Sequence, residues 1–166
     1  MRIVPYLGPR PDEFRLLRGR LAFTGAAGLG ATGTFTVATA TGQVELGGLF
    51  VWCTEDLQDT VDGAVFSLGV TGSPLAFWNS SDTPVDLDNI NAGVGLTNFS
   101  AVETGNAHNL VPAFTGGVPH TKLIGADIIG TVSTQAITDG QLDFFVWWRP
   151  LSSNGNLALG ANLTVI

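Results

Sequence analysis

Two adjacent tryptophans, Trp147 and Trp148, close a run over residues 142–148 in which every residue but Asp143 is apolar, and they constrain the fold more than any other feature. The run is rich in aromatic residues, which favour strands, and an Arg-Pro pair ends it. Successive side chains of a strand point to opposite faces, so the two indoles cannot share one core. We expect one ring, with Phe144 or Phe145, to enter a core. The other should pack under a loop, an N-terminal arm or a neighbouring subunit.

Alternation with a period of two recurs elsewhere and predicts an all-β protein. In residues 34–41 it places Phe35 and Val37 on one face, and its phase inverts after Val37. A bulge near Val37 explains the inversion, and so do small alanines facing outward. The Gly47-Gly48 pair suggests a second irregularity. No segment shows a convincing run at helical spacing, so we predict an antiparallel β-sandwich, jelly-roll-like, of about eight strands.

Turn residues divide the second half of the chain into further elements. Residues 71–74 should connect two short strands, and Asp139-Gly140 should form a turn between strands at 123–134 and 142–149. A last strand is expected near residues 157–165. Residues 82–119 are polar and rich in asparagine, which predicts a long excursion with one or two strands.

The N-terminal segment is expected to be an arm. Residues 1–14 contain Pro5, Pro9 and Pro11, and proline this dense prevents both a helix and a central strand. Fourteen extended residues reach up to about 50 Å. We therefore divide the chain into an extended arm, residues 1–14, and a β-sandwich domain, residues 15–166.

Charge is scarce and unevenly distributed. Charged residues make up 13% of the chain, about half of the ~25% of an average domain, which favours a surface that is partly covered by assembly. The first twenty residues carry five arginines against two acids, a net of +3, whereas the rest carries Lys122 and Arg149 against twelve acids, a net of −10. Such a body repels phosphates, so nucleic acid is an unexpected partner. No apolar run approaches the ~20 residues that span a bilayer, and the first residues lack the apolar stretch of a signal peptide.

Catalytic chemistry is not indicated. Cys53 is the only cysteine and ends an apolar strand, so we interpret it as a small buried hydrophobe. His108 and His120 lie in polar, loop-like surroundings, and no G-x-S-x-G motif occurs. Twelve acids make some carboxylate pair inevitable, but nothing selects one for glycosidase chemistry. We expect no enzyme and no cofactor.

Residues 86–97 match the calcium-binding loop motif only in part. Asp86 and Asp88 match its opening, whereas Ile90 occupies the fifth position and Thr97 replaces the bidentate glutamate. A solvated turn is the favoured interpretation, and a weak metal site at these two aspartates stays open.

Exposed tryptophans leave a second class of function open. A ring of Trp78, Trp147 or Trp148 could stack on a sugar face, as in a carbohydrate-binding module of a host-recognition spike. We favour packing for Trp52 and Trp78, and an interface for the second ring of the adjacent pair. The expected interface residues are those of the arm, its root and the end of the Trp-Trp strand: Arg2, Tyr6, Arg10, Arg15, Trp147, Trp148 and Arg149.

Three stretches carry a resemblance: "GLFVWCTEDL", "AVFSLGVTGSPLAFWN" and "IGADIIGTVSTQAITDGQLDFFVWWRPLSSNG". Together they resemble small proteins encoded among the structural genes of tailed bacteriophages, over residues 34–155 and most specifically over 137–152. The resemblance implies a non-enzymatic component of the virion. We expect a capsid decoration (cement) protein, a trimer that binds the major capsid protein or other virion proteins and bridges capsomers through its arm. A tail, neck or baseplate subunit is the alternative.

Overall fold

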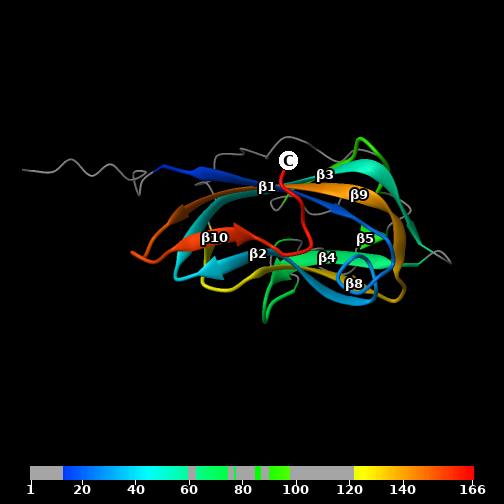
Figure 1. Ribbon diagram of the computed structural model, residues 1–166, viewed down its shortest axis with the longest axis horizontal. Coiled ribbons are helices and arrows are strands. Elements are labelled where there is room, and N and C mark those ends of the chain that lie inside the picture. Colours follow the sequence, from blue (N-terminus) through cyan, green and yellow to red (C-terminus); the bar gives the residue numbers. More distant parts are fainter. Residues whose placement is uncertain (1–12, 60–62, 75–76, 78–84, 87–89, 98–121) are drawn as a thin grey trace, which may run out of the picture.

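The computed structural model describes residues 13–59, 63–74, 77, 85–86, 90–97 and 122–166, and it folds them into two layers of antiparallel strands (Figure 1). The first sheet has the order β1-β9-β3-β6, with β7 also paired to β3, and the second has the order β10-β2-β8-β4-β5. The strands are β1 Arg15–Ala22, β2 Gly33–Thr41, β3 Val44–Asp59, β4 Val65–Val70, β5 Val85–Asp86, β6 Gly95–Thr97, β7 Lys122–Ile124, β8 Ile128–Ser133, β9 Ile137–Pro150 and β10 Asn156–Leu159.

The all-β prediction is confirmed, with two antiparallel sheets that are compatible with a β-sandwich. Ten strands are described where about eight were expected, and β5, β6 and β7 have only two or three residues. The jelly-roll topology stays a prediction. Of the expected arm, residues 1–12 lie outside the described residues, as does most of the 82–119 excursion. Within the described part of the chain we find no helix that could cross a membrane.

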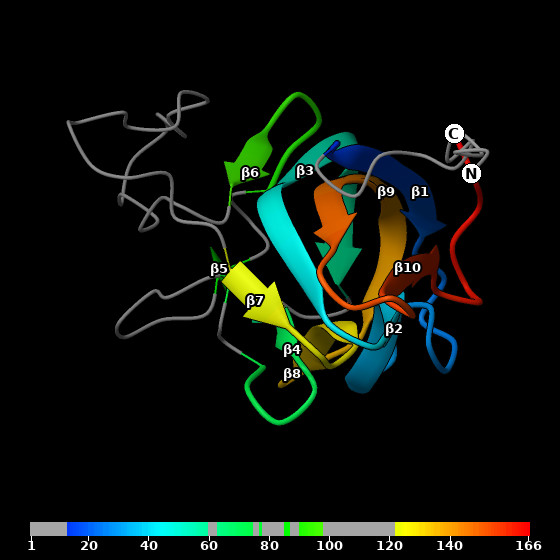
Figure 2. The ribbon, with the colours of Figure 1, turned by 90° about the vertical axis from the view of Figure 1, so that its left-hand side faces the viewer.

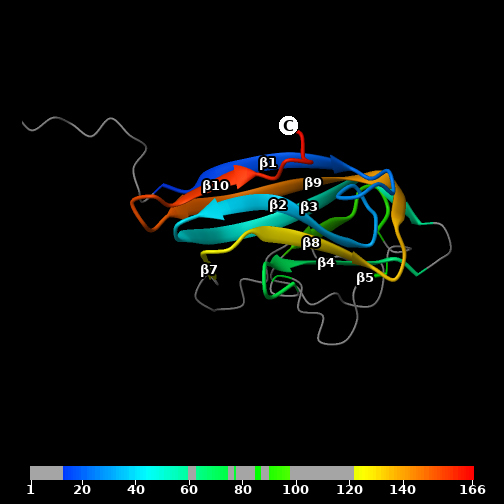
Figure 3. The same cartoon turned by 60° about the horizontal axis from the view of Figure 1, so that its bottom comes forward.

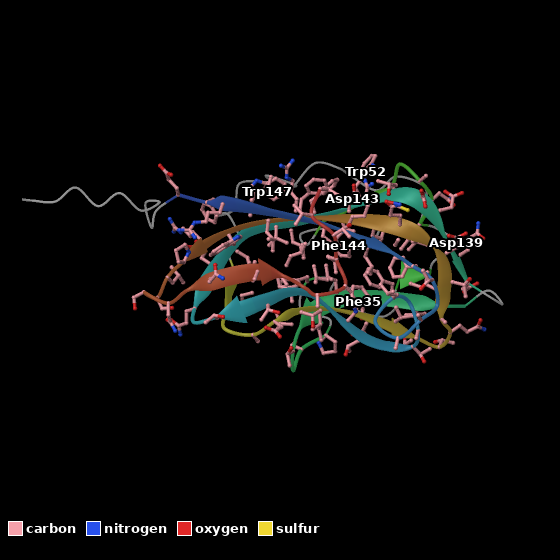
Figure 4. The ribbon with its side chains drawn as sticks, viewed as in Figure 1. Phe35, Trp52, Asp139, Asp143, Phe144 and Trp147 are labelled. Atoms are coloured by element: carbon pink, nitrogen blue, oxygen red, sulfur yellow. The ribbon has the colours of Figure 1, made fainter. Side chains whose placement is uncertain are left out.

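The core lies between the two sheets and follows the alternation of their strands. In β9 the side chains of Leu142, Phe144, Val146 and Trp148 are all buried. Phe35 of β2 lies opposite them, with its ring centroid 6.5 Å from that of Phe144 (Figure 4). From Leu142 to Trp148, every second residue of β9 therefore faces this core, and the residues between face outward.

Two bulges shift the alternation of inward and outward side chains, one in β2 and one in β3. They confirm the irregularities predicted near Val37 and at Gly47-Gly48. The register between β2 and β8 shifts between Thr36 and Ala38, so a bulge at Val37 accounts for the phase inversion. The register between β3 and β9 shifts between Leu46 and Gly48. This second bulge keeps the apolar residues on both sides of Gly47 facing the core.

The turn predicted at Asp139-Gly140 is wrong. Both residues lie inside β9, which pairs with the end of β3 through several shifts of register, and the turn between β8 and β9 instead lies near Thr134, which has a φ of +69°. Gly140 does adopt a positive φ, +102°, but at a shift of register within the strand. A Cβ there would collide with the backbone of Asp56 and Leu57. The Asp-Gly pair thus signals a positive φ, which a bulge needs as much as a turn does.

Two other expected elements are shorter than predicted. The strand expected at 123–134 is divided into β7 and β8, and residues 125–127 between them leave the ladder. There Asp127 turns its carboxylate to the β2 backbone and accepts a hydrogen bond of 2.9 Å from the Ala40 amide. The last strand, β10 of the second sheet, ends at Leu159, and Thr164 then pairs with Arg20 of the first sheet through an isolated bridge.

The two sheets approach each other where β1 and β10 meet (Figures 2 and 3). Gly19 of β1 has no side chain, and the space that a Cβ would need is filled by the side chain of Leu159 from β10. This contact places β10 beneath the inner face of β1. β1 is also the terminal strand of the first sheet, so its outer side lies at the edge of that sheet.

Candidate interaction face

The outward side of the first sheet carries a continuous set of large apolar side chains. Pairing between β1, β9 and β3 places Leu16 beside Trp147, and Phe145 beside Phe50. The next row along β9 brings Trp52 beside Asp143. We call this set the outer aromatic face, and its members are Phe14, Leu16, Phe50, Trp52, Phe145 and Trp147.

The two adjacent tryptophans take opposite sides of the sheet, as the sequence predicts. Trp148 is 4% exposed and belongs to the core, whereas Trp147 is 40% exposed and lies on the outer aromatic face (Figure 4). Phe144 accompanies Trp148 inward, and Phe145 accompanies Trp147 outward. The described residues therefore leave the second indole partly exposed.

Neighbouring rings of the outer aromatic face pack against one another. The centroid of Phe50 lies 6.0 Å from that of Trp52, with an interplanar angle of 31°, and 5.9 Å from that of Phe145, with an angle of 41°. These three side chains are half-buried, whereas Phe14 and Leu16 are 42% and 45% exposed. The face thus has a packed aromatic middle and more exposed apolar groups towards the start of β1.

Two ion pairs flank the aromatic rings on the same side of the sheet. Nε and Nη2 of Arg20 donate to the two carboxylate oxygens of Asp143 at 2.5 and 2.7 Å, a bidentate arrangement. Nε of Arg149 donates to Glu45 at 2.5 Å. The hydrogen bond from Arg20 to Asp143 raises the pKa of Arg20, so this guanidinium stays charged. Both carboxylates are largely buried, and each has an arginine to compensate it.

The root of the N-terminal segment is held against the end of β9. The guanidinium of Arg15 lies 5.0 Å from the centroid of the Trp148 ring, and that of Arg149 lies 5.0 Å from the Phe14 ring. A Cβ at Gly47 would stand 2.5 Å from the Phe14 ring, so the bulge glycine makes room for it. These contacts fix the position at which the N-terminal segment leaves the sandwich.

The structure brings four of the seven expected interface residues to one end of the first sheet: Arg15, Trp147, Trp148 and Arg149. Arg2, Tyr6 and Arg10 lie outside the described residues. Trp148 is a core residue rather than a surface residue. Sequence reasoning missed Phe50 as a member of the face. The period of two places Phe145 on the same face as Trp147. Phe50 could not be found in this way, because a single sequence does not specify the pairing of β3 with β9.

The outward side of the second sheet carries a row of small polar side chains in place of the large apolar ones of the first sheet. This row contains Thr34, Thr131 and Ser67, from β2, β8 and β4. Thr34 is exposed, whereas Ser67 is buried and the Thr131 hydroxyl is buried without a hydrogen-bond partner among the described residues. Among the described residues, every aromatic side chain that is at least partly exposed belongs to the outer aromatic face.

Candidate metal ligands are dispersed over the described ranges. No three His, Cys, Asp or Glu side chains gather there as a metal site. His108, His120, Trp78 and Asp88 lie outside these ranges, and Asp86 belongs to β5.

Cys53 is buried, as expected, and burial raises the pKa of its thiol to about 11. We predict that iodoacetamide at pH 8 alkylates it at least about a hundredfold more slowly in the folded chain than in urea, because the thiolate fraction is lower by that factor. Mass spectrometry of timed samples measures the rate. Equal labelling in the two states would contradict the burial of this side chain.

Comparison with protein-family models, with curated proteins and with solved structures finds no match for this chain. Fold and site together define a two-sheet antiparallel β protein with one aromatic outer face.

Proposed function

We propose that this chain is a structural subunit of a bacteriophage particle, a capsid decoration (cement) protein that packs against neighbouring copies and the shell. The observation that carries the proposal is the outer aromatic face, with Trp147 and Leu16 side by side and each at least two-fifths exposed. The resemblance of residues 34–155 to phage structural proteins supplies the biological setting.

Energetics favour burial of this face in an assembly. Fully covering a large apolar side chain is worth about 1.5–3 kcal/mol, and tryptophan is enriched among the residues that dominate binding energy. Flanking guanidinium groups at Arg18, Arg20 and Arg149 add a polar rim of the sort that surrounds interface cores. We infer a homo-oligomer, a trimer, whose neighbours shield Trp147 in the assembled particle.

A protein partner suits this face better than a sugar. A sugar ring stacks on an open, accessible aromatic surface, whereas Phe50, Trp52 and Phe145 are tilted against one another and half-buried. Among the described tryptophans, Trp147 alone offers an indole that is two-fifths exposed, and Trp78 lies outside the described residues. A carbohydrate-binding module is therefore the weaker candidate among the classes considered.

Charge placed at Trp147 should weaken decoration. We expect Trp147→Glu to bind expanded capsids at least about tenfold more weakly than the unmodified chain, because a buried hot-spot ring is replaced by a carboxylate. Thr34→Glu is the matched control, since Thr34 is exposed on the opposite side of the sandwich. Co-sedimentation with capsids measures both. Undiminished binding of Trp147→Glu would refute the proposed interface.

The number of copies in purified particles separates the head from the tail. A decoration protein is present in multiples set by the symmetry of the shell, whereas a tail, neck or baseplate subunit is present in few copies. Quantitative mass spectrometry against the major capsid protein gives this number. A count of a few copies would favour the tail alternative.

A further inference from the structure

The outer edge of β1 is an incomplete β-ladder. On one side β1 pairs along its whole length with β9. On its other side, among the described residues, it pairs only at Arg20, whose amide donates to the Thr164 carbonyl at 2.8 Å and whose carbonyl accepts from the Thr164 amide at 2.9 Å. This edge therefore already accepts an antiparallel partner at one position.

The alternation of backbone groups identifies the open positions. In an antiparallel ladder, successive residues direct their N–H and C=O groups to opposite sides. The backbone N–H and C=O groups of Arg20 point away from β9, because they bond to Thr164. The backbone groups of Arg18 and Leu16, two and four residues earlier, therefore point away from β9 too. Neither makes a backbone hydrogen bond on this edge within the described part of the chain, and both are exposed. Two consecutive positions for strand pairing are thus vacant beside an occupied one.

The positive charge of β1 indicates which kind of strand could bind at its open edge. The strand contains Arg15, Arg18 and Arg20 and has no acidic residue. Arg20 is paired with Asp143, but Arg18 has no ion-pair partner in the described ranges. A second β1 would bring three further arginines to the same edge, and like charges on neighbouring strands repel. An incoming strand with carboxylates is favoured instead.

We propose that the edge of β1 at Leu16 and Arg18 receives an extended acidic segment of a partner protein, which adds a strand to the first sheet. The segment runs antiparallel to β1, as Thr164 does, and donates to and accepts from the backbone of both residues. A carboxylate side chain opposite Arg18 and an apolar one opposite Leu16 complete the match. This binding mode does not depend on the particle role proposed above.

A short, end-blocked peptide that alternates valine and glutamate tests the proposal on the intact chain. Amide hydrogen exchange, followed by NMR, is the readout. In the free protein the Leu16 and Arg18 amides should exchange fast, whereas those of Leu17 and Gly19, which face β9, should be protected. The peptide should protect Leu16 and Arg18 and leave the other two unchanged.

Two controls separate strand addition from other binding. The same peptide with N-methyl groups along its pairing edge keeps its charge and side chains but loses its donors, and it should not protect Leu16 or Arg18. The variant Arg18→Glu should bind the valine-glutamate peptide about tenfold more weakly and gain affinity for a valine-lysine peptide.

Several results would overturn the proposal. These are the absence of binding at millimolar peptide, equal binding of the N-methylated peptide, and equal binding of the acidic and basic peptides by the unmodified chain. Self-association that protects Leu16 and Arg18 without peptide would assign the edge to a second copy instead. All of these results are measured on the isolated chain. A failure of strand addition therefore does not affect the capsid-binding test of the proposed function.

Discussion

Trp148→Ala should lower the free energy of unfolding by about 3–5 kcal/mol, the range for removing a large aromatic side chain from a core. Trp148 is 4% exposed, and it pairs with Leu46 in β3 and Arg15 in β1. Its loss leaves a cavity at the end of the sandwich and removes the ring over which the Arg15 guanidinium lies. Urea denaturation followed by circular dichroism measures the effect.

Trp147→Ala is the matched control, because it removes the same side chain one residue earlier. Its ring is 40% exposed on the outer aromatic face, so we expect the stability of the isolated chain to change by less than about 1 kcal/mol. The two variants should therefore differ by at least about 2 kcal/mol. Equal losses would contradict the assignment of the two indoles to opposite sides of the sheet.

Arg20→Ala should cost about 2–3 kcal/mol of stability. The Asp143 side chain is 8% exposed, and its two oxygens accept from Arg20 at 2.5 and 2.7 Å. Removing the guanidinium leaves a largely buried carboxylate without those donors, which is the costly way to break such a pair. We place the value below the 3–5 kcal/mol of fully buried pairs because the Arg20 side chain is 39% exposed.

A double-mutant cycle distinguishes the ion pair from simple packing. Adding Asp143→Ala to Arg20→Ala should restore part of the lost stability, because the unpaired carboxylate is then absent. Arg18→Ala is the control on the same strand, since Arg18 is exposed and has no ion pair in the described ranges; it should change stability by less than about 0.5 kcal/mol. If the double variant is less stable than Arg20→Ala alone, the pair is not the source of the effect.

Local patterns predict the strands of this fold well, and they predict its connections less well. Alternation in residues 142–148 gives both the strand and the opposite directions of Trp147 and Trp148, because the period of two is a property of the backbone. The Asp139-Gly140 prediction fails because the sequence reveals the need for a positive φ but not whether a turn or a bulge supplies it.

The candidate site depends on pairing between distant strands, which a single sequence does not specify. Trp147 could be recognised by position, since its neighbour fills the core. The ring contacts of Phe50, the ion pair between Arg20 and Asp143 and the contact between Gly47 and Phe14 each join residues far apart in the chain. Only the register of β1 and β3 on β9 brings them together.

Hydroxyl-radical footprinting of Trp147, in the free chain and in purified particles, is the most direct test of the claim that neighbours cover the outer aromatic face. The indole should be oxidised readily in the free chain, where it is 40% exposed, and should be protected severalfold in the particle. The peptide that contains Thr34, on the opposite sheet, serves as the internal reference for the oxidation rate. Oxidation of Trp147 at the same rate in both states would contradict the account.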